Sequence, residues 1–346
     1  MTQTMTRPFN PERCFIIAEL SANHGHSLET ALATVRAAKA CGADAIKIQT
    51  YTADTITLDC DNEHFQINQD TIWDGTTLYK LYQEAYTPWE WHAAIQAEAH
   101  NAGLIFFSTP FDPSAVDFLE TLDVPIYKIA SFEITDIPLI EYTASKGKPM
   151  IISTGIATLA DIDAAVQACH RMGNHDITLL KCTSSYPAPV EEANLLTIPN
   201  LAQTFGVKAG LSDHTLGHVV AIAAVALGAT VIEKHFIIDR ALGGPDASFS
   251  LTPNEFKLMV EGVRQAEAAL GSVSYTMTKK TIASRKFSRS LFVCCDIKAG
   301  EILTTKNVRS VRPNDGLPPI ELPNVLGRKA KKYIPLGTPL SWDLLI

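Results

Sequence analysis

The sequence has no excess of basic residues and no long, uninterrupted apolar run. Its 29 lysines and arginines are outnumbered by 37 aspartates and glutamates, which gives a formal net charge of −8. A negative charge of this size argues against broad binding to nucleic acid or to an anionic membrane surface. The longest apolar stretch, residues 219–232, is interrupted by Gly228 and Thr230 and is too short to span a bilayer.

Paired cysteine motifs and a secretory signal are also missing. The seven cysteines are odd in number and form no CxxC pair, and the adjacent Cys294 and Cys295 cannot easily bridge each other. Reduced thiols in a cytosolic protein are the simplest interpretation. The opening residues, MTQTMTRPFN, contain no apolar segment of the kind that a secretory signal needs. We therefore expect a cytoplasmic protein.

What the sequence does contain is a regular alternation of two kinds of segment. Apolar, β-branched runs are separated by amphipathic, helix-like stretches such as 28–41, 89–102 and 159–172. The runs are CFIIAEL, AIKIQTY, LIFFSTP, IYKIAS, MIISTG, ITLLKCT, VKAGLSDH and VIEKHF. Such runs are typical of strands buried on both faces, and their alternation with helices indicates a parallel sheet. Eight units in roughly 255 residues predict a (β/α)8 barrel. The alternative is a doubly wound sheet, but no Gly-rich phosphate motif follows the first strand.

The pattern changes at Gly271, which ends the last helix-like segment. A polar stretch follows, and then short strands and turns with many glycines and prolines replace the helices. We therefore predict a barrel domain over 1–271, a linker over 272–289 and a small β-rich domain over 290–346. A domain of about sixty residues is near the lower size limit for folding alone, so docking on a larger partner would stabilise it.

Each apolar run of the predicted barrel ends in a polar or ionisable residue. In a barrel of this kind, the side chains at the carboxyl ends of the strands line the active-site face. The residues at these positions are Glu19, Lys47, Thr109, Ser131, Ser153, Ser184, Ser212 with His214, and His235. One such residue would mean little, but eight positions drawn from a small chemical set predict a site.

Two histidines follow neighbouring predicted strands. His214 and His235 would lie close together, and two imidazoles suit a divalent transition metal with open positions for water and substrate. The alternative is that each is an ordinary hydrogen-bonded histidine. His24, near Glu19, is a candidate third ligand or positioning group. The histidines on helix-like stretches are expected at the surface; they include His92, His100 and His170.

Two lysines interrupt otherwise apolar strands, Lys47 in IKIQT and Lys128 in YKIAS. A buried ammonium is costly unless it is paired. With the strand-end hydroxyls, these lysines could surround a phosphate or a carboxylate through charge-assisted hydrogen bonds. Alternatively, they pair with a carboxylate of a neighbouring strand, Glu19 or Glu133. Lys234 differs, because strand alternation directs it away from the site; we expect it to face the helical layer or a salt bridge.

The motifs together resemble the sialic acid synthase family over nearly the whole chain. The matching motifs are FIIAELSANH, AIKIQTY, FSTPFD, YKIASFE, IISTG, KCTSSYP, GLSDHT, VIEKHF and SVRP. The segments TIWDGTTLYKLYQEAYTPWEWH, SRSLFV and SVRPNDGL are most similar to the pseudaminic acid synthase branch. Members condense phosphoenolpyruvate with an N-acetylated amino sugar, giving a nine-carbon 2-keto acid and phosphate. The resemblance also implies a (β/α)8 barrel followed by an antifreeze-like (SAF) domain, and a divalent cation, Mn²⁺, Co²⁺ or Mg²⁺.

The resemblance implies a role for each matching position. It implies metal ligation by His214 and His235 and catalytic roles for Glu19, Lys47 and Tyr186. The implied phosphoenolpyruvate contacts are Lys47, Thr109, Lys128, Ser131, Ser153, Ser184, Tyr186 and Ser212. The implied contacts to the sugar are Glu133, Tyr186 and Asp246, with Arg312 of the small domain reaching the N-acetyl group. The family's domain-swapped homodimer would bring that arginine from a second subunit.

Two departures and two alternatives remain at this stage. Ser184 stands where the family commonly carries Asn, and NHGHS replaces the usual NHxGS after the first strand, so the loop around Gly25 and His26 can differ. The same chemistry on another N-acylated sugar would give neuraminic or legionaminic acid. A sugar- or ice-binding protein with an inert barrel is a third hypothesis, and the intact Glu19, His214 and His235 count against it.

Overall fold

The computed structural model describes residues 13–68 and 71–346 of the chain. It forms two compact units, the first ending at Gly271 and the second beginning at Ser272. The opening segment MTQTMTRPFN, on which the expectation of no secretory signal depends, lies outside the described residues. No helix in the described ranges is long and apolar enough to cross a membrane.

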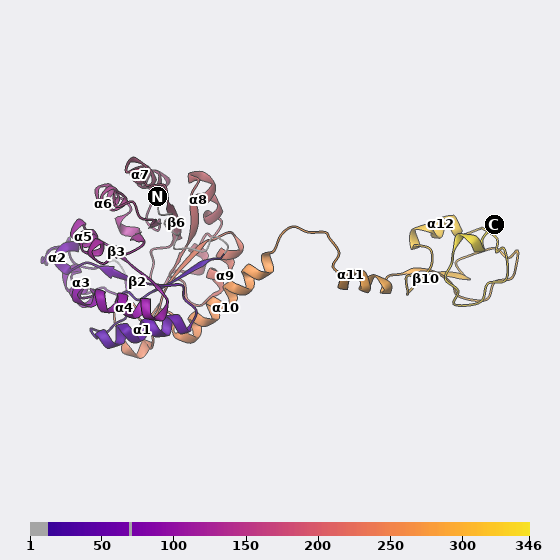
Figure 1. Cartoon of the computed structure of the whole chain (residues 1–346), viewed down its shortest axis with the longest axis horizontal. Helices are drawn as coiled ribbons and strands as arrows, with labels where there is room; N and C mark the ends of the chain where they lie inside the picture. The colour runs from indigo at the N-terminus through magenta and orange to yellow at the C-terminus, as the bar shows by residue number, and fades with distance from the viewer. Residues whose placement is uncertain (1–12, 69–70) are drawn as a thin grey trace, which may run out of the picture. The chain divides into compact units, whose positions relative to one another are not determined.

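The first unit is built around eight parallel strands in the order β1 to β8, and β8 pairs with β1 to close a barrel. Figure 1 shows the strands surrounded by helices. The strands are β1 (Phe15–Glu19), β2 (Ala45–Thr50), β3 (Ile105–Pro110), β4 (Tyr127–Ile129), β5 (Met150–Ser153), β6 (Ile177–Cys182), β7 (Lys208–Asp213) and β8 (Val231–His235). Each lies in one of the eight apolar runs, so the predicted (β/α)8 barrel is confirmed.

The helices begin where the sequence supplies capping groups. Asp112 and Asp136 accept hydrogen bonds from the first turns of their helices, and each is followed by proline in that first turn. Thr158 and Asp161 form a capping box at the start of another. The main helices of the barrel are α1 (Leu28–Ala40), α4 (His92–Ala102), α5 (Pro113–Thr121), α6 (Ile137–Ala144), α7 (Leu159–Arg171), α8 (Thr197–Phe205), α9 (Val219–Ala226) and α10 (Pro253–Leu270), with α2 (Ala53–Ile56) and α3 (Leu78–Ala85) in the loop after β2.

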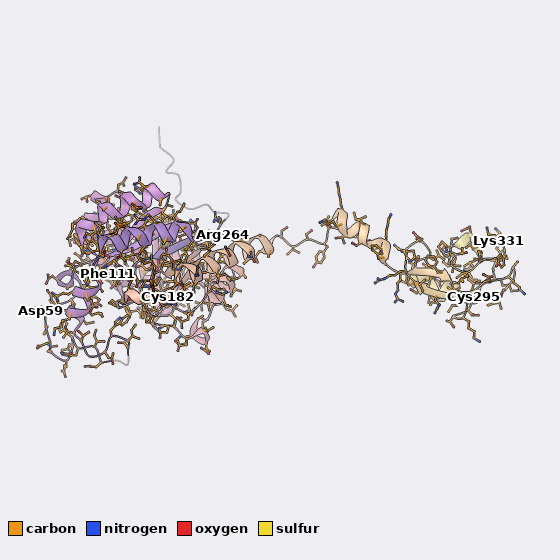
Figure 2. The ribbon with its side chains drawn as sticks, turned by 90° about the horizontal axis from the view of Figure 1, so that it is seen from below. Asp59, Phe111, Cys182, Arg264, Cys295 and Lys331 are labelled. Carbon is orange, nitrogen blue, oxygen red and sulfur yellow. The ribbon has the colours of Figure 1, made fainter. Side chains whose placement is uncertain are left out.

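The last helix of the barrel unit contacts the residues around the start of the first strand. Arg264 of α10, labelled in Figure 2, donates to the carbonyl oxygen of Cys14 at 2.7 Å and pairs with Asp44 at 2.8 Å. Asp44 in turn accepts from the backbone N–H of Ile16 at 2.9 Å. These contacts hold the amino-terminal end of β1, and the opposite end of the strand carries Glu19.

Successive side chains of strand β8 point to opposite sides of the barrel wall. Lys234 points away from the barrel interior and forms a buried ion pair with Asp213 at 2.7 Å. It also donates to the carbonyl oxygen of Thr215. The predicted salt bridge is confirmed. Its neighbours Glu233 and His235 face the opposite way and reach the pocket at the barrel mouth.

His92 corrects one of the surface predictions. It is fully buried, and one ring nitrogen lies 2.8 Å from the hydroxyl of Thr50 while the other lies 3.2 Å from the carbonyl oxygen of Pro88. The prediction was wrong because His92 starts α4 on the face that packs against the barrel, where polar partners satisfy the ring. His100 is exposed and His170 is partly exposed.

The second unit has its own small core. Strands β9 (Ser290–Val293) and β10 (Val308–Val311) pair in antiparallel fashion. Isolated antiparallel bridges, such as Ile297 with Ile334, link other segments of this unit, and α12 (Leu322–Val325) adds one short turn of helix. The core side chains include Leu291, Val293, Ile297, Leu303, Val325 and Leu340. Residues 272–289 contain the short helix α11 (Lys279–Ser284), with no buried side chain in it.

Candidate active site

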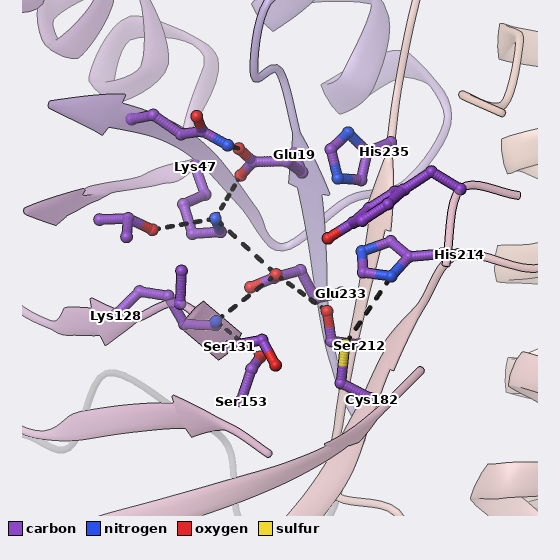
Figure 3. A pocket seen from close by; sticks show the side chains of 14 residues that line it. Glu19, Lys47, Lys128, Ser131, Ser153, Cys182, Ser212, His214, Glu233 and His235 are labelled. Atoms are coloured by element: carbon purple, nitrogen blue, oxygen red, sulfur yellow. Dashed lines mark hydrogen bonds and ion pairs between the residues drawn. The ribbon is translucent and has the colours of Figure 1, made fainter. Parts of the chain in front are cut away.

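The carboxyl ends of the barrel strands surround a pocket lined mainly by polar side chains (Figure 3). Because all eight strands are parallel, residues from distant parts of the sequence meet at the same rim. The lining residues are Glu19, Lys47, Gln49, Thr109, Lys128, Ala130, Ser131, Ser153, Cys182, Tyr186, Ser212, His214, Glu233 and His235. Ten of the residues predicted from the sequence are therefore brought together.

Glu19 and Lys47 form a buried ion pair on adjacent strands. Their Oε2 and Nζ atoms lie 2.6 Å apart, and Lys47 also donates to Thr109 at 3.1 Å. Gln49 donates to the other oxygen of Glu19 at 3.2 Å. Burial raises the pKa of Glu19 to about 7, and Lys47 offsets only part of that effect. This carboxyl can therefore hold or release a proton near neutral pH.

Glu233 lies between the two pocket lysines. Its Oε1 atom is 3.7 Å from Nζ of Lys47 and 3.8 Å from Nζ of Lys128, and it accepts a hydrogen bond from Ser212 at 3.2 Å. Burial opposes its charge, but the two lysines outweigh burial and lower its pKa. The alternative of lysines paired with carboxylates is thus correct for Glu19 and Lys47, while Lys128 meets Glu233 rather than Glu133.

A cluster of small side chains lies beside Lys128. Lys128 donates to Ser153 at 2.7 Å. Ser184 donates to Ser131 at 3.0 Å, and Ser131 also accepts from the backbone N–H of Ile156 at 3.2 Å. A side-chain carbon on Gly155 would lie only 2.2 Å from Oγ of Ser184 and 2.6 Å from Oγ of Ser131. Only glycine leaves room for these hydroxyls, so the cluster can present donors to an oxyanion. Ser184 stands behind Ser131 rather than in the lining.

The two histidines predicted as metal ligands lie side by side, with ring centroids 5.4 Å apart. His214 Nδ1 is 2.9 Å from the carbonyl oxygen of Thr183. A carbonyl can only accept, so Nδ1 carries a hydrogen, and in the neutral ring Nε2 keeps a lone pair. Nδ1 of His235 is buried 3.7 Å from Asp246 and has no hydrogen-bond partner within residues 13–68 and 71–346. Burial first, and then nearby positive groups, lower the pKa of His235 and favour the neutral ring that metal ligation needs.

These observations fit a divalent cation held by His214 and His235. An unpartnered buried nitrogen and a second ring oriented by a backbone carbonyl are the features expected of such ligands. Across residues 13–68 and 71–346, no group of three or more His, Cys, Asp or Glu side chains is placed to hold a metal.

The prediction for His24 is not supported by its position. The ring is buried, but it packs against Trp91 and His26 rather than lining the pocket. Its Nδ1 atom accepts a hydrogen bond from the backbone N–H of His26 at 3.2 Å. Burial lowers the pKa of His24 to about 4. His24 therefore fits a residue that shapes the loop after β1.

The residues predicted to face the sugar occupy different places. Tyr186 lines the pocket and packs against His214, with ring centroids 4.4 Å apart, and against Trp73. Glu133 is partly buried, two residues after the lining residue Ser131, and burial raises its pKa to about 7. Asp246 is buried and accepts from the backbone N–H of Ala22 at 3.4 Å. Arg312 is exposed in the second unit.

Four lining residues were missed by the sequence analysis: Glu233, Gln49, Cys182 and Ala130. Strand alternation already directed Glu233 to the same side as His235, and Gln49 to the same side as Lys47. That signal was sufficient to find both. Cys182 had no comparable signal, because its contact with His214, at 3.7 Å, depends on the pairing of β6 with β7.

Comparisons with known proteins agree with this geometry. The NeuB family matches residues 34–275, and the SAF domain matches residues 288–346. The chain is 49% identical to the pseudaminic acid synthase of Helicobacter pylori, over 95% of this chain and 96% of that protein. It is 36% identical to the N,N'-diacetyllegionaminic acid synthase of Legionella pneumophila, over 95% and 94%. The crystal structure of the N-acetylneuraminic acid synthetase of Leptospira borgpetersenii, in complex with citrate, has a TM-score of 0.71 and 31% identity, covering 82% of this chain and 94% of that one.

Proposed function

Because the chain belongs to the NeuB family, we propose that it condenses phosphoenolpyruvate with 2,4-diacetamido-2,4,6-trideoxy-L-altrose. The products are pseudaminic acid and inorganic phosphate. The observation that carries this proposal is the 49% identity to a pseudaminic acid synthase along nearly the whole length of both chains. The pocket supports it, because it combines two lysines, several hydroxyls and two histidines at one rim.

The lysines and hydroxyls of the pocket would bind phosphoenolpyruvate. Lys47 and Lys128 supply charge-assisted hydrogen bonds to its phosphate and carboxylate. The supporting hydroxyls are those of Thr109, Ser131, Ser153, Ser184, Tyr186 and Ser212. They fix the orientation of the substrate, so that its C3 atom faces the aldehyde carbon of the open-chain sugar. The sugar itself would be held by Glu133, Tyr186 and Asp246.

Glu19 would move the proton that the condensation requires. With a pKa near 7 it can donate to the aldehyde oxygen as C3 attacks, and the adjacent Lys47 stabilises the resulting carboxylate. A divalent cation, Mn²⁺, Co²⁺ or Mg²⁺, held by His214 and His235, would supply Lewis-acid polarisation of that oxygen. Water then adds at C2 and gives one proton to the Glu19 carboxylate. The C2–O bond of the tetrahedral intermediate breaks, the C2 hydroxyl becomes the keto group, and its proton leaves with the phosphate. Tyr186, against His214, would close the pocket over the reacting atoms.

The proposal also covers the oligomeric state of the enzyme and its cellular compartment. We propose a domain-swapped homodimer in which Arg312 of one chain reaches the sugar in the barrel of the other. The apolar side chains of Val273, Tyr275 and Phe287 in the predicted linker are exposed. Exposed apolar side chains of this kind are typical of surfaces that bind another protein, which supports contact with a second chain. All seven cysteines are free, which supports a reducing, cytoplasmic location.

A phosphate-release assay with a panel of amino sugars tests the proposed function. The diacetamido trideoxy altrose should be the preferred acceptor, with N-acetylmannosamine poor or inactive. The 36% identity to a legionaminic acid synthase makes the legionaminic acid precursor the alternative to include. A clear preference for N-acetylmannosamine would instead assign the chain to neuraminic acid synthesis.

A further inference from the structure

Glu233 lies at the centre of the pocket, yet the proposed reaction gives it no part. Its side chain is only 7% exposed. Its Oε1 atom is nearly equidistant from the two lysine ammonium groups, 3.7 Å from Lys47 and 3.8 Å from Lys128. The Ser212 hydroxyl donates to this oxygen at 3.2 Å, and the second oxygen has no hydrogen-bond partner among the described residues. Figure 3 shows the carboxylate between the lysines.

The hydrogen bonds of the two lysines leave a place for another anion. A lysine ammonium has three N–H donors. Lys47 donates one of them to Thr109 at 3.1 Å and forms an ion pair with Glu19 at 2.6 Å. Lys128 uses two, on Ser153 at 2.7 Å and the carbonyl oxygen of Ile129 at 3.0 Å. Glu233, at 3.7 Å and 3.8 Å, is beyond hydrogen-bond distance of both lysines. Among the described residues, each lysine therefore has an N–H left for an incoming oxyanion.

Each lysine of this group has a carboxyl partner before any ligand binds. Lys47 pairs with Glu19 at 2.6 Å, and Lys128 has the carboxylate of Glu233 at 3.8 Å. Within the part of the chain that the structure describes, Glu233 is the only carboxylate within 4 Å of Lys128. Without it, the buried Lys128 ammonium would have no counter-ion, which is strongly unfavourable. With it, an incoming phosphate meets a carboxylate of its own sign beside the lysines that must bind it.

We infer that Glu233 is an internal counter-anion, which holds Lys47 and Lys128 ready in the empty site and limits how tightly that site retains phosphate. The same carboxylate therefore stabilises the free enzyme and promotes release of the phosphate product. The inference rests on the proposed function for the identity of the anion. Glu233 acts through the lysines, so it is a positioning residue.

The test compares Glu233→Gln with Glu233→Asp in the full-length chain. Glutamine keeps the size and can still accept from Ser212, but it removes the charge; aspartate keeps the charge. Inorganic phosphate is titrated into each protein by calorimetry, with a chelator present and no sugar. E233Q should bind phosphate at least about tenfold more tightly than the wild type, because the like-charge repulsion is gone. E233D should stay within about threefold of the wild type.

Steady-state kinetics give a second measurement that a purely structural role would not produce. In E233Q, both the KM for phosphoenolpyruvate and kcat should fall, because the substrate binds more tightly and the phosphate leaves more slowly. Unchanged or weaker phosphate binding in a folded E233Q would overturn the inference. A wild type that binds phosphate but rejects every sugar tested would instead contradict the proposed function alone.

A double variant keeps the inference testable if E233Q does not fold. Lys128→Met combined with Glu233→Gln removes one positive and one negative charge together. If Glu233 is the counter-ion of Lys128, the double variant should fold and melt at a higher temperature than E233Q. A double variant as unstable as E233Q would overturn the pairing.

Discussion

Oε2 of Glu19 lies 2.6 Å from Nζ of Lys47, with both side chains almost completely buried at the ends of β1 and β2. Parallel pairing places the two residues directly opposite each other. A buried pair at this distance fixes both groups in position before any substrate arrives. The acid and the cation of the proposed reaction are therefore preorganised by the register of two strands.

Glu19→Gln should lower kcat by about 10² to 10⁴-fold, the usual contribution of a general acid or base. Glutamine fills the same space and can still accept from Lys47, so the fold and the binding of phosphoenolpyruvate should persist. Circular dichroism and a phosphoenolpyruvate titration check those two points, and initial rates of phosphate release check the loss. A variant that kept more than a tenth of wild-type kcat would exclude Glu19 as the proton donor.

His235→Ala should weaken binding of Mn²⁺ at least about tenfold, because only one imidazole of the pair would remain. The metal content after dialysis and a Mn²⁺ titration measure this loss independently of activity. His235 lies at a strand end facing the pocket, so the melting temperature of the chelator-treated protein should change little. Chelation of the wild type should abolish activity, and Mn²⁺, Co²⁺ or Mg²⁺ should restore it; full activity in excess chelator would remove the cation from the mechanism.

Glu133→Gln should change the pH dependence of stability. The pKa of Glu133 in the folded protein is raised to about 7 from an ordinary value of 4.5. The protonated carboxyl therefore contributes stability that is fully present below about pH 4.5 and is lost as pH rises through 7. Glutamine cannot ionise, so E133Q should gain about 1–3 kcal/mol relative to the wild type between pH 5 and pH 8. Urea unfolding at both pH values measures the change, and an equal difference at each pH would contradict it.

Gly155→Ala should raise the KM for phosphoenolpyruvate about tenfold or more. The new carbon would lie 2.2 Å from Oγ of Ser184 and 2.6 Å from Oγ of Ser131, so these hydroxyls would have to move. The backbone of Gly155 is not left-handed, so alanine there adds crowding without backbone strain. Ser184→Ala in the same chain removes the closer contact and should recover part of the loss. A G155A enzyme with wild-type KM would show that the serine cluster does not hold the substrate.

Much of the site could be predicted because a parallel barrel brings all its strand ends to one rim. Once eight apolar runs were recognised, the residue after each run was a site candidate, whatever its distance along the chain. Alternation also predicted that Lys234 would leave the pocket. It directed Glu233 into the pocket as well, but its partner Lys128 lies on β4, and the contact depends on a distance across the barrel interior.

The positions of His92 and His24 depend on tertiary packing, which the local sequence pattern does not predict. His92 resembled a surface residue of an amphipathic helix, yet Thr50 and Pro88 supply hydrogen bonds that allow its burial. His24 lies in the loop after β1, but its ring packs against Trp91 and does not line the pocket. In both cases the position of the histidine ring depends on side chains from another element. The sequence of the segment alone therefore does not predict whether the ring is buried or lines the pocket.

The proposed domain swap makes a prediction about mixed dimers. Arg312→Ala and Glu19→Ala should each inactivate the enzyme, the first through the sugar and the second through proton transfer. If Arg312 acts in the barrel of the partner chain, co-refolding the two variants produces a hybrid dimer in which one site combines an intact barrel with an intact small domain. The other site carries both defects, so the hybrid should recover up to half of wild-type activity, measured by phosphate release. If the small domain instead folds back on its own barrel, every site keeps one defect, and hybrids isolated with two different affinity tags would be inactive. Tagged wild-type chains, co-refolded in the same way, control for losses on refolding.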